Sequence, residues 1–580
     1  MKTSLRYAAI FVVLSVASFL VFSITSTYHF HERIPPNPVF KAVRHLVSVE
    51  TTNSAQLSAC PTTNCHSSSV ECSLSCKIKP THAATVAKYS SFKVINAKQT
   101  YKRCDQLEIG IEARDSINRP KSTGGDYFWV WIHNNKLNAS SAADEIVDHN
   151  NGSYTALVTL YWEGAVEINV TLVHSSEAIN ILRRVRDNNT TPRNAYQGTF
   201  QIDGNRVTKP CHISTSMFIY DYPHDANKSL TFCNYTDSKL GFPWYCVKPD
   251  HFPCDSYYKH STQLDEYKKA KATFKSLMTS HEYTMVLDSL REIRETSTSP
   301  TTSVYVKRVA NRQSSTPSSC LKHPPPRCVP GLPPRSNSNV AGHYHKDEWI
   351  SNVCQKHDFT ADNGAPITKC LQNTNLHFYG DSTGRQWFEY LINHLNKNGT
   401  MEMNVTNSKN GPIFGLDQRN NISLSFLFHG FPFSTGMAKV ADIDYVANRL
   451  DKLKGGPDSV IFISMWAHFW ILDLQFYRDR LRSVKDALTR LQHRTPGTRV
   501  FFKSPNTYAG VGKFWGANIW YATEMDRALR EEIVGLPDVT VIDVWDMTIG
   551  HRTGLNIHPR EIVVGQEVSM FLSFLCTDNK

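Results

Sequence analysis

The sequence predicts a multidomain protein in which an N-terminal β-sandwich precedes an α/β domain with a parallel sheet. Two patterns carry this prediction. Between residues 86 and 260, short apolar runs alternate with polar residues at period two, as half-buried strands do. Beyond residue 340, apolar strands alternate with amphipathic helices, which favours a parallel sheet covered on both faces.

Composition excludes several classes of protein. With 41% hydrophobic and 20% charged residues, the chain can bury sizeable cores and is not a disordered protein. The net charge of +11 is spread along the chain without a block of like charges, so no nucleic-acid partner is expected, although an acidic glycan or a membrane surface fits. The sequence has no zinc-finger spacing, P-loop or GxGxxG motif, so we predict no metal site and no bound cofactor.

The N-terminus indicates entry into the secretory pathway. Residues 7–24 form an apolar run that follows Lys2 and Arg6 and stays bulky to its end. We therefore expect a type II signal anchor, with the rest of the chain luminal. A cleaved signal peptide, with weak cleavage positions at Ser23 and Ser26, is the alternative and would give a secreted protein. The predicted location is the Golgi or the cell-surface membrane, or the extracellular space if the segment is removed.

Cysteines and glycosylation signals agree with that compartment. The chain has 14 cysteines without metal-site spacing, so disulfides are expected. Cys576 follows an apolar helix predicted over 562–575, and we expect it to pair with another cysteine of the C-terminal domain. Ten Asn-x-Ser/Thr sequons predict a glycoprotein: Asn138, Asn151, Asn169, Asn188, Asn189, Asn227, Asn234, Asn398, Asn404 and Asn421.

The chain divides into five predicted segments. They are the anchor or signal peptide (1–24), a Ser/Thr-rich luminal stem (25–85), the β-sandwich with a cysteine-rich end (86–260), a helical and Pro-rich linker (261–340) and the α/β domain (341–580). The strands predicted for the sandwich are 92–97, 106–114, 126–133, 154–162 and 166–173. Those predicted for the α/β domain are 375–379, 459–465, 499–503 and 539–545.

Two amphipathic helices are predicted between the later strands. One carries an apolar stripe of Leu481, Val484, Leu488 and Leu491. The other carries Met525, Leu529 and Ile533 and ends before Gly535 and Pro537.

A serine stands where open α/β folds bind ligands. The strand 375–379 runs directly into Gly380, Asp381 and Ser382, and a helix follows. The hydroxyl of Ser382 is thus expected at the carboxyl edge of the sheet, beside helix N-terminal N–H groups that can hold an oxyanion. An ordinary helix N-cap would also explain Asp-Ser at this position. His558 follows the strand 539–545 and is expected at the same edge, so the two fit a nucleophile and its base.

The motifs together resemble a known family. The run YGDSTGRQW (379–387), with a late His-Pro loop, is similar to the PC-esterase branch of the SGNH (GDSL-like) hydrolases. The runs at 124–132, 161–178 and 232–249 resemble the neurexophilin domain, an immunoglobulin-like sandwich. Joined in this order, they resemble the neurexophilin and PC-esterase domain family (NXPE).

The resemblance implies roles for individual residues. Ser382 occupies the nucleophile position, and Arg385 and Trp387 complete a GDS-x-x-R-x-W pattern that is similar to plant wall-polysaccharide O-acetyltransferases, where the arginine positions the acyl group. Gly430 resembles the glycine whose N–H holds the oxyanion. His468 stands in the block where the superfamily offers an asparagine as a second donor.

The chain departs from the family pattern at the triad acid. The family has an aspartate three residues before the histidine, whereas this chain has Leu555 there and Asn556 next to it. Asn556 can orient a ring without supplying charge. Asp543 and Asp546 are the nearest upstream carboxylates and are the other candidates for the acid.

Two functions remain in competition. The first is a serine-dependent O-acetyltransferase or esterase acting on a glycan such as sialic acid or on a glycoprotein acceptor, with an acyl donor such as acetyl-CoA. The second is a catalytically inactive secreted or membrane-bound binding glycoprotein, with a cell-surface receptor of neurexin type, as the neurexophilin resemblance implies.

Overall fold

The computed structural model describes fourteen stretches of the chain: 84–187, 196–222, 230–262, 275–288, 290–295, 303–307, 320–321, 323–332, 340–360, 364–432, 436–470, 472–507, 518–551 and 556–576. The predicted anchor (1–24) and nearly all of the predicted stem (25–85) lie outside the described residues.

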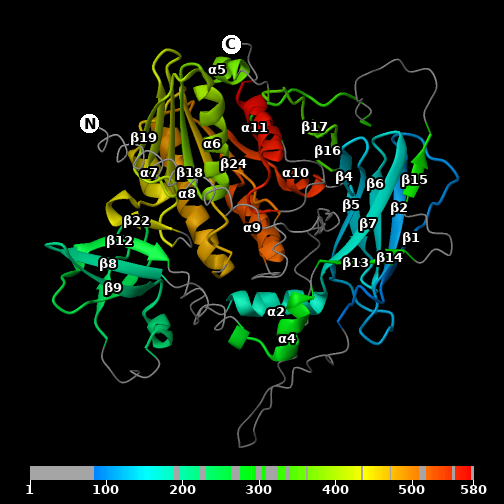
Figure 1. Ribbon diagram of the computed structural model, residues 1–580, viewed down its shortest axis with the longest axis horizontal. Coiled ribbons are helices and arrows are strands. Elements are labelled where there is room, and N and C mark those ends of the chain that lie inside the picture. The colour runs from blue at the N-terminus through cyan, green and yellow to red at the C-terminus, as the bar shows by residue number, and fades with distance from the viewer. Residues whose placement is uncertain are drawn as a thin grey trace, which may run out of the picture. The chain divides into compact units, whose positions relative to one another are not determined.

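Two sheets pack face to face as the predicted sandwich (Figure 1). The first has the order β14-β1-β2-β6-β5. Its strands are β1 (Ser91–Val94), β2 (Gln106–Glu112), β5 (Glu145–Asp148), β6 (Ser153–Thr159) and β14 (Arg294–Glu295). The second has the order β13-β7-β3-β4-β16-β17, with β15 also paired to β7. Its strands are β3 (Tyr127–Asn134), β4 (Ala139–Ala142), β7 (Gly164–His174), β13 (Arg291–Glu292), β15 (Ser303–Val306), β16 (Gly342–His345) and β17 (Glu348–Ser351).

Alternation in the sequence explains how the sandwich is filled. Leu107, Ile109 and Ile111 of β2 are buried while the residues between them are not, so one face of the strand points into the core. Phe128 of β3 and Tyr154 of β6 meet edge to face across the two sheets, with ring centroids 4.7 Å apart. Strand β3 is buried along its whole length, which means that both of its faces are covered.

Segments outside the predicted sandwich complete its sheets. Strands β13, β14 and β15 come from the predicted linker 261–340, which also supplies α4 (Ser280–Leu287) against α2 (Ser176–Asp187). Strands β16 and β17 come from beyond residue 340, where β16 pairs with β4 through Tyr344 and Ser140. Short strands of this kind cover the unpaired backbone groups at the edges of a sheet.

The cysteine-rich end of the predicted sandwich forms a separate sheet with the order β10-β11-β9-β8-β12-β22. Its strands are β8 (Tyr196–Ile202), β9 (Asn205–His212), β10 (Phe232–Asn234), β11 (Tyr245–Val247), β12 (Tyr257–Thr262) and β22 (Met437–Lys439), and the 3₁₀ helices η2 (Thr215–Tyr220) and η3 (Cys254–Ser256) accompany it. Because β22 belongs to the α/β part of the chain, this sheet joins residues from both halves of the sequence.

The α/β part contains a sheet with the order β19-β20-β21-β18-β23-β24-β25. Its strands are β18 (Thr374–Gly380), β19 (Glu402–Val405), β20 (Ile413–Asp417), β21 (Ile422–Phe428), β23 (Ser459–Ser464), β24 (Arg499–Lys503) and β25 (Val539–Ile542). From β21 to β25 neighbouring strands are parallel, and β19 and β20 add an antiparallel edge. The predicted parallel sheet is therefore present within a mixed sheet.

Helices cover both faces of this sheet. Ile461 and Ile463 of β23 lie in the core that α7 (Val446–Lys452), α8 (Leu474–Arg494) and α9 (Asn518–Ile533) complete. Val460 and Phe462 lie in the core of α5 (Ala365–Leu371), α6 (Ser382–Leu395) and α11 (Glu561–Leu575). The predicted apolar stripes are buried in α8 and α9, so both helix predictions are confirmed. Helix α10 (Trp545–Gly550) and the 3₁₀ turns η4 (Asn396–Asn398) and η5 (Val440–Asp442) complete the described elements of this part.

The strand order places a switch point at the end of β18. After β18 the chain moves to β21 on one side and then to β23 on the other, and the carboxyl end of a strand at such a point is where open α/β sheets bind ligands. The register pairs Gly380 with both Phe428 and Ser464, which brings the loops after β18, β21 and β23 together at one edge.

Five disulfides cross-link the described residues: Cys104–Cys320, Cys211–Cys246, Cys233–Cys254, Cys328–Cys354 and Cys370–Cys576. The last joins α5 to the residue that ends α11, which confirms the expectation that Cys576 pairs within the C-terminal domain.

We predict that Cys370→Ser/Cys576→Ser lowers the free energy of unfolding by about 3–5 kcal/mol, because the bond closes a separation of 206 residues. Cys328→Ser/Cys354→Ser, which opens a separation of only 26 residues, is the matched control and should cost less. Denaturant unfolding of the secreted variants measures both changes. Equal losses would contradict the loop-length argument.

Candidate active site

The turn from β18 into α6 depends on Gly380. This residue has a φ of +150°, and a Cβ added to it would lie 1.9 Å from the carbonyl oxygen of Ser464 on β23. Only glycine allows the two strand ends to approach so closely. Asp381 is then the N-cap of α6, and Ser382 is its first residue. The N-cap interpretation of this motif is thus correct, and it leaves the side chain of Ser382 available for a different contact.

Ser382 and His558 meet across 176 residues of sequence. Nε2 of His558 lies 2.8 Å from Oγ of Ser382, which is hydrogen-bond distance. Ser382 is half-buried, while His558 is exposed to solvent on one side. The structure therefore brings the predicted nucleophile and base together at an accessible position.

The pKa of His558 lies below its ordinary value of 6.5. Removal of water from the protein-facing side of the ring is the main cause, and the positive charges of Arg385 and Lys503 act in the same direction. The carboxylate of Asp381 opposes them by favouring the imidazolium. At neutral pH the imidazole is consequently neutral and able to accept a proton from Ser382.

Asp381 is a fully buried carboxylate with four hydrogen-bond donors. Its Oδ1 accepts bonds from the backbone N–H and the hydroxyl of Thr383, at 2.9 and 2.7 Å. Its Oδ2 accepts bonds from the N–H groups of Trp466 and Ala467, at 2.9 and 2.8 Å. The side chain thus ties the start of α6 to the loop after β23 and sets a negative charge near His558. Reasoning from the sequence treated Asp381 only as a cap.

The two predicted oxyanion residues lie in the loops that flank Ser382. Gly430 follows β21, two residues beyond the register partner of Gly380, and has a φ of +91°. His468 lies in the loop after β23 and is buried, which lowers its pKa to about 4. The charge of Asp381 opposes that shift, whereas His558 and Arg385 add to it. His468 is therefore a neutral imidazole, which can donate one hydrogen bond.

Arg385 and Trp387 lie on α6, but their surroundings differ. Arg385 is an ion-pair partner of Glu389 at 3.0 Å and donates to the carbonyl of Lys409, and its charge acts on both His468 and His558. Trp387 points into the core, where its Nε1 donates to the buried Glu567 at 2.7 Å. Trp387 is therefore a packing residue, while Arg385 belongs to the electrostatic environment of the site.

The loop that carries His558 is held from two sides. Nδ2 of Asn506, after β24, donates to the carbonyl of Ile557 at 3.1 Å. Nε2 of Gln386, on α6, donates to the carbonyl of Pro559 at 2.7 Å. The Oδ1 of Asn556 accepts the backbone N–H of His558 at 3.1 Å, so this side chain orders the backbone of the turn.

Asn506 is itself fixed by a buried lysine. Nζ of Lys503 donates to its Oδ1 at 2.9 Å, and burial lowers the pKa of Lys503. Sequence reasoning missed Asn506, Lys503 and Gln386. The one available signal was that Lys503 ends a buried strand and Asn506 follows it, at the edge where Ser382 and His558 were expected.

The candidates for the triad acid have other contacts. Asp543 is ion-paired with Arg530 at 3.1 Å and caps the N–H of Trp545. Asp546 is buried in α10 and accepts the N–H of Ala341 at 2.8 Å. Leu555 lies outside the described residues. The assignment of an acid to either aspartate remains a prediction, and the carboxylate whose charge acts on His558 is that of Asp381.

A cavity of about 1190 Å³ lies apart from this site, between β3, β5, α2, α4 and α9. Its walls include Tyr127, Ile146, Ile179, Met285 and Trp520, and neither Ser382 nor His558 lines it. Among the residues that the structure describes, no cluster of three or more His, Cys, Asp or Glu side chains could hold a metal ion.

The predicted glycosylation positions differ in exposure. Asn151, Asn234, Asn404 and Asn421 are exposed, whereas Asn138 and Asn169 are half-buried and Oδ1 of Asn169 is buried within β7. The side chains of Asn188, Asn189, Asn227 and Asn398 lie outside the described part of the chain. Occupancy of all ten remains a prediction.

Two family models match separate parts of the chain. Residues 349–576 match the family model described as NXPE family member 4-like, C-terminal domain. Residues 67–272 match the model of neurexophilin. Among solved structures, the chain is similar to the Lin-41 filamin domain at 21% identity over 15% of this chain and 82% of that chain, but the TM-score of 0.13 is too low to support an argument about fold.

The disulfides are typical of a protein that folds in the secretory pathway. In the described stretches of the chain we find no helix with the length and apolarity needed to cross a bilayer. The predicted anchor at 1–24 lies outside those stretches and remains a prediction.

We predict that the reaction of Ser382 with a fluorophosphonate rises with pH and levels off, with a midpoint below 6.5, because only the neutral imidazole accepts the serine proton. Arg385→Gln removes a positive charge that lowers the pKa of His558, so its midpoint should move to higher pH. Arg482→Gln on α8, an exposed partner of Glu532, is the control and should leave the midpoint unchanged. A midpoint above 6.5, or one that Arg385→Gln does not move, contradicts this account.

Proposed function

We propose, from the premise that the chain belongs to the NXPE family, that its C-terminal part is an SGNH-like acyl-transfer domain. In this proposal the domain moves an acyl group, such as acetyl, onto a hydroxyl of a glycan or onto water. The observation that carries the proposal is the 2.8 Å contact between Nε2 of His558 and Oγ of Ser382 at the switch point of a parallel sheet.

The proposed reaction has two steps. Oγ of Ser382 attacks the carbonyl carbon of an acyl donor while Nε2 of His558 takes the hydroxyl proton, and the donor leaves with that proton. The oxyanion is held by N–H groups of Ser382 and Gly430. A sugar hydroxyl or water then gives its proton to His558 and attacks the acyl-serine. The bond between the acyl carbon and Oγ breaks, and His558 returns the proton to Oγ, which releases the acylated product and restores the serine.

The surroundings of the dyad support catalysis without an aspartate three residues before His558. Asn506 and Gln386 hold the backbone on either side of the histidine, so the ring is oriented through its loop. Asp381 supplies a negative charge that favours the imidazolium formed in each step. The exposure of His558 suits an acceptor as large as a glycoprotein glycan, because such an acceptor reaches only a surface site.

We predict that Ser382→Ala and His558→Ala each lower glycan O-acylation by on the order of 10³-fold or more, and that the double variant is no worse than either. The two side chains act as one unit, so their effects do not add. Ser459→Ala, a buried serine at the start of β23 and so at the opposite edge of the same sheet, is the matched control and should retain activity. Glycan O-acetylation in cells that depend on the protein, measured by mass spectrometry, decides the result. Unchanged O-acetylation with a folded Ser382→Ala protein would refute the serine mechanism.

The alternative function is that of a binding glycoprotein with a receptor of neurexin type. It is supported by the neurexophilin match over residues 67–272 and by the cavity at the sandwich, which is separate from the dyad. If binding is the only function, wild type and Ser382→Ala should bind immobilised neurexin ectodomain equally and neither should react with a fluorophosphonate. Labelling of wild type that is lost in Ser382→Ala would contradict a purely binding role.

A further inference from the structure

The residues on both sides of Gly430 contact the sheet formed by β8–β12 and β22. Strand β22, which follows the loop that carries Gly430, pairs with β12, with Lys439 opposite Lys259 and Met437 opposite Ser261. The far end of the loop is therefore hydrogen-bonded to a strand that lies in the neurexophilin match.

The near end of the loop contacts the same sheet through aromatic side chains. Phe431 directly follows Gly430, and its ring stacks on Trp244 with centroids 4.7 Å apart and an angle of 14° between the planes. The ring of His260 meets Phe431 edge to face, at 5.1 Å. Trp244 has no exposed surface and Phe431 only 8%, so this stack is dry. Stacked aromatic pairs stabilise a contact beyond the area they bury.

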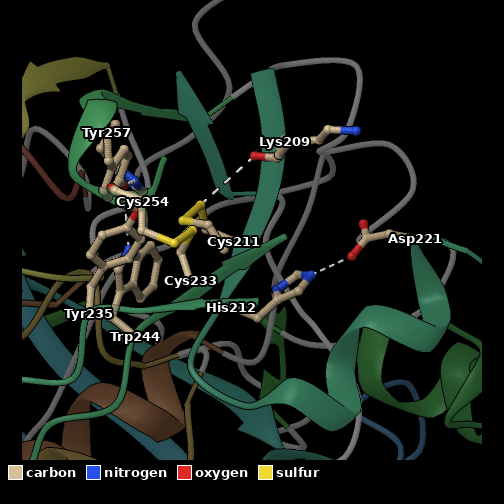
Figure 2. Close-up of a disulfide and its surroundings, with 11 residues drawn as sticks. Lys209, Cys211, His212, Asp221, Cys233, Tyr235, Trp244, Cys254 and Tyr257 are labelled. Atoms are coloured by element: carbon tan, nitrogen blue, oxygen red, sulfur yellow. Dashed lines mark hydrogen bonds and ion pairs between the residues drawn. A yellow bond between two sulfur atoms is a disulfide. The ribbon is translucent and has the colours of Figure 1, made fainter. Parts of the chain in front are cut away.

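Two disulfides hold Trp244 in place (Figure 2). Cys211–Cys246 joins β9 to β11 two residues after Trp244, and Cys233–Cys254 joins β10 to η3. Figure 2 shows the rings of Tyr235, Trp244 and Tyr257 gathered beside the second disulfide. The indole Nε1 also donates to the hydroxyl of Tyr257 at 3.4 Å. The indole is thus held within a covalently cross-linked sheet.

Gly430 itself is enclosed by residues that this sheet supports. A Cβ at Gly430 would lie 2.6 Å from Cδ1 of Tyr445, so the glycine backbone packs directly on that ring. Tyr445 meets Phe242 edge to face with centroids 5.2 Å apart. Asn448, three residues after Tyr445, donates to Asp237 at 2.8 Å. Contacts from residues 237–260 therefore surround the loop on several sides.

We propose that the sheet formed by β8–β12 positions the Gly430 loop for catalysis and that Trp244 is the positioning residue at its centre. This rests on the proposed function, in which the N–H of Gly430 holds the oxyanion. The consequence is that a neurexophilin-like part of the chain is a working component of the acyl-transfer site. Trp244 acts through Phe431 and does not touch the reacting atoms.

A positioning role and a purely structural role predict different kinetics. A misplaced oxyanion donor stabilises the transition state less but changes the binding of the substrate ester little. We therefore expect kcat to fall while KM changes little. We expect Trp244→Leu in the full-length glycoprotein to lower kcat for hydrolysis of 4-nitrophenyl acetate by about 10- to 100-fold, with KM within about twofold. Trp244→Phe keeps an aromatic ring on Phe431 and should retain most of the activity.

The matched control is Phe218→Leu. Phe218 is a buried aromatic residue of η2 beside the same sheet, where it stacks on Phe232 with centroids 4.8 Å apart. This variant should lower thermal stability without changing kcat. If Trp244→Leu is not secreted, Phe431→Leu removes the same stack from the loop side and is tested in its place.

Hydrogen exchange provides a readout independent of activity. Amides of residues 429–431 should exchange faster in Trp244→Leu than in wild type or Phe218→Leu. An unchanged kcat together with unchanged exchange in this loop overturns the inference, as does an equal loss of kcat in Phe218→Leu. If wild type neither hydrolyses the ester nor reacts with a fluorophosphonate, the proposed function fails. The exchange rates then still decide whether the sheet holds the loop.

Discussion

The architecture of the site depends on one buried carboxylate. Burying Asp381 without compensation would cost several kcal/mol, and the four donors around it offset that cost only in this arrangement of β18, α6 and the loop after β23. Because Ser382 directly follows Asp381, the contacts that fix Asp381 also fix the position of the Ser382 hydroxyl. The same charge reaches His558 and His468, so a helix cap also tunes two imidazoles.

His558 is held in place through hydrogen bonds to the backbone on both sides of it. Asn506 and Gln386 bind the carbonyl oxygens of Ile557 and Pro559, and Lys503 fixes Asn506 from the interior of the sheet. A triad aspartate orients a histidine through the ring, whereas these contacts orient it through the peptide groups on both sides. The second arrangement supplies no charge at the imidazole, and in this site the negative charge that favours the imidazolium is that of Asp381.

The sequence allowed the pairing of Ser382 and His558 to be predicted because parallel strands end at a common edge. Any residue placed directly after such a strand is confined to that edge, whatever the details of the loops. The roles of Asn506 and Gln386 could not be predicted in this way. Each donates a hydrogen bond to a backbone carbonyl oxygen, and every residue has such an oxygen, so the sequence does not indicate which one is bound. The strands from 261–340 were hidden for another reason: β13 and β14 are two residues long, too short for alternation to appear.

The sharing of sheets between the two halves of the chain constrains how the protein is made. While the ribosome is still adding residues 143–341, β4 already has β3 on one side, but its other side has no partner because β16 has not yet been synthesised. The nascent sandwich thus exposes an open sheet edge until β16 has been made, and such edges attract other unfinished chains. A lumenal chaperone that shields strand edges would accordingly be needed more by this protein than by a free-standing sandwich of the same size.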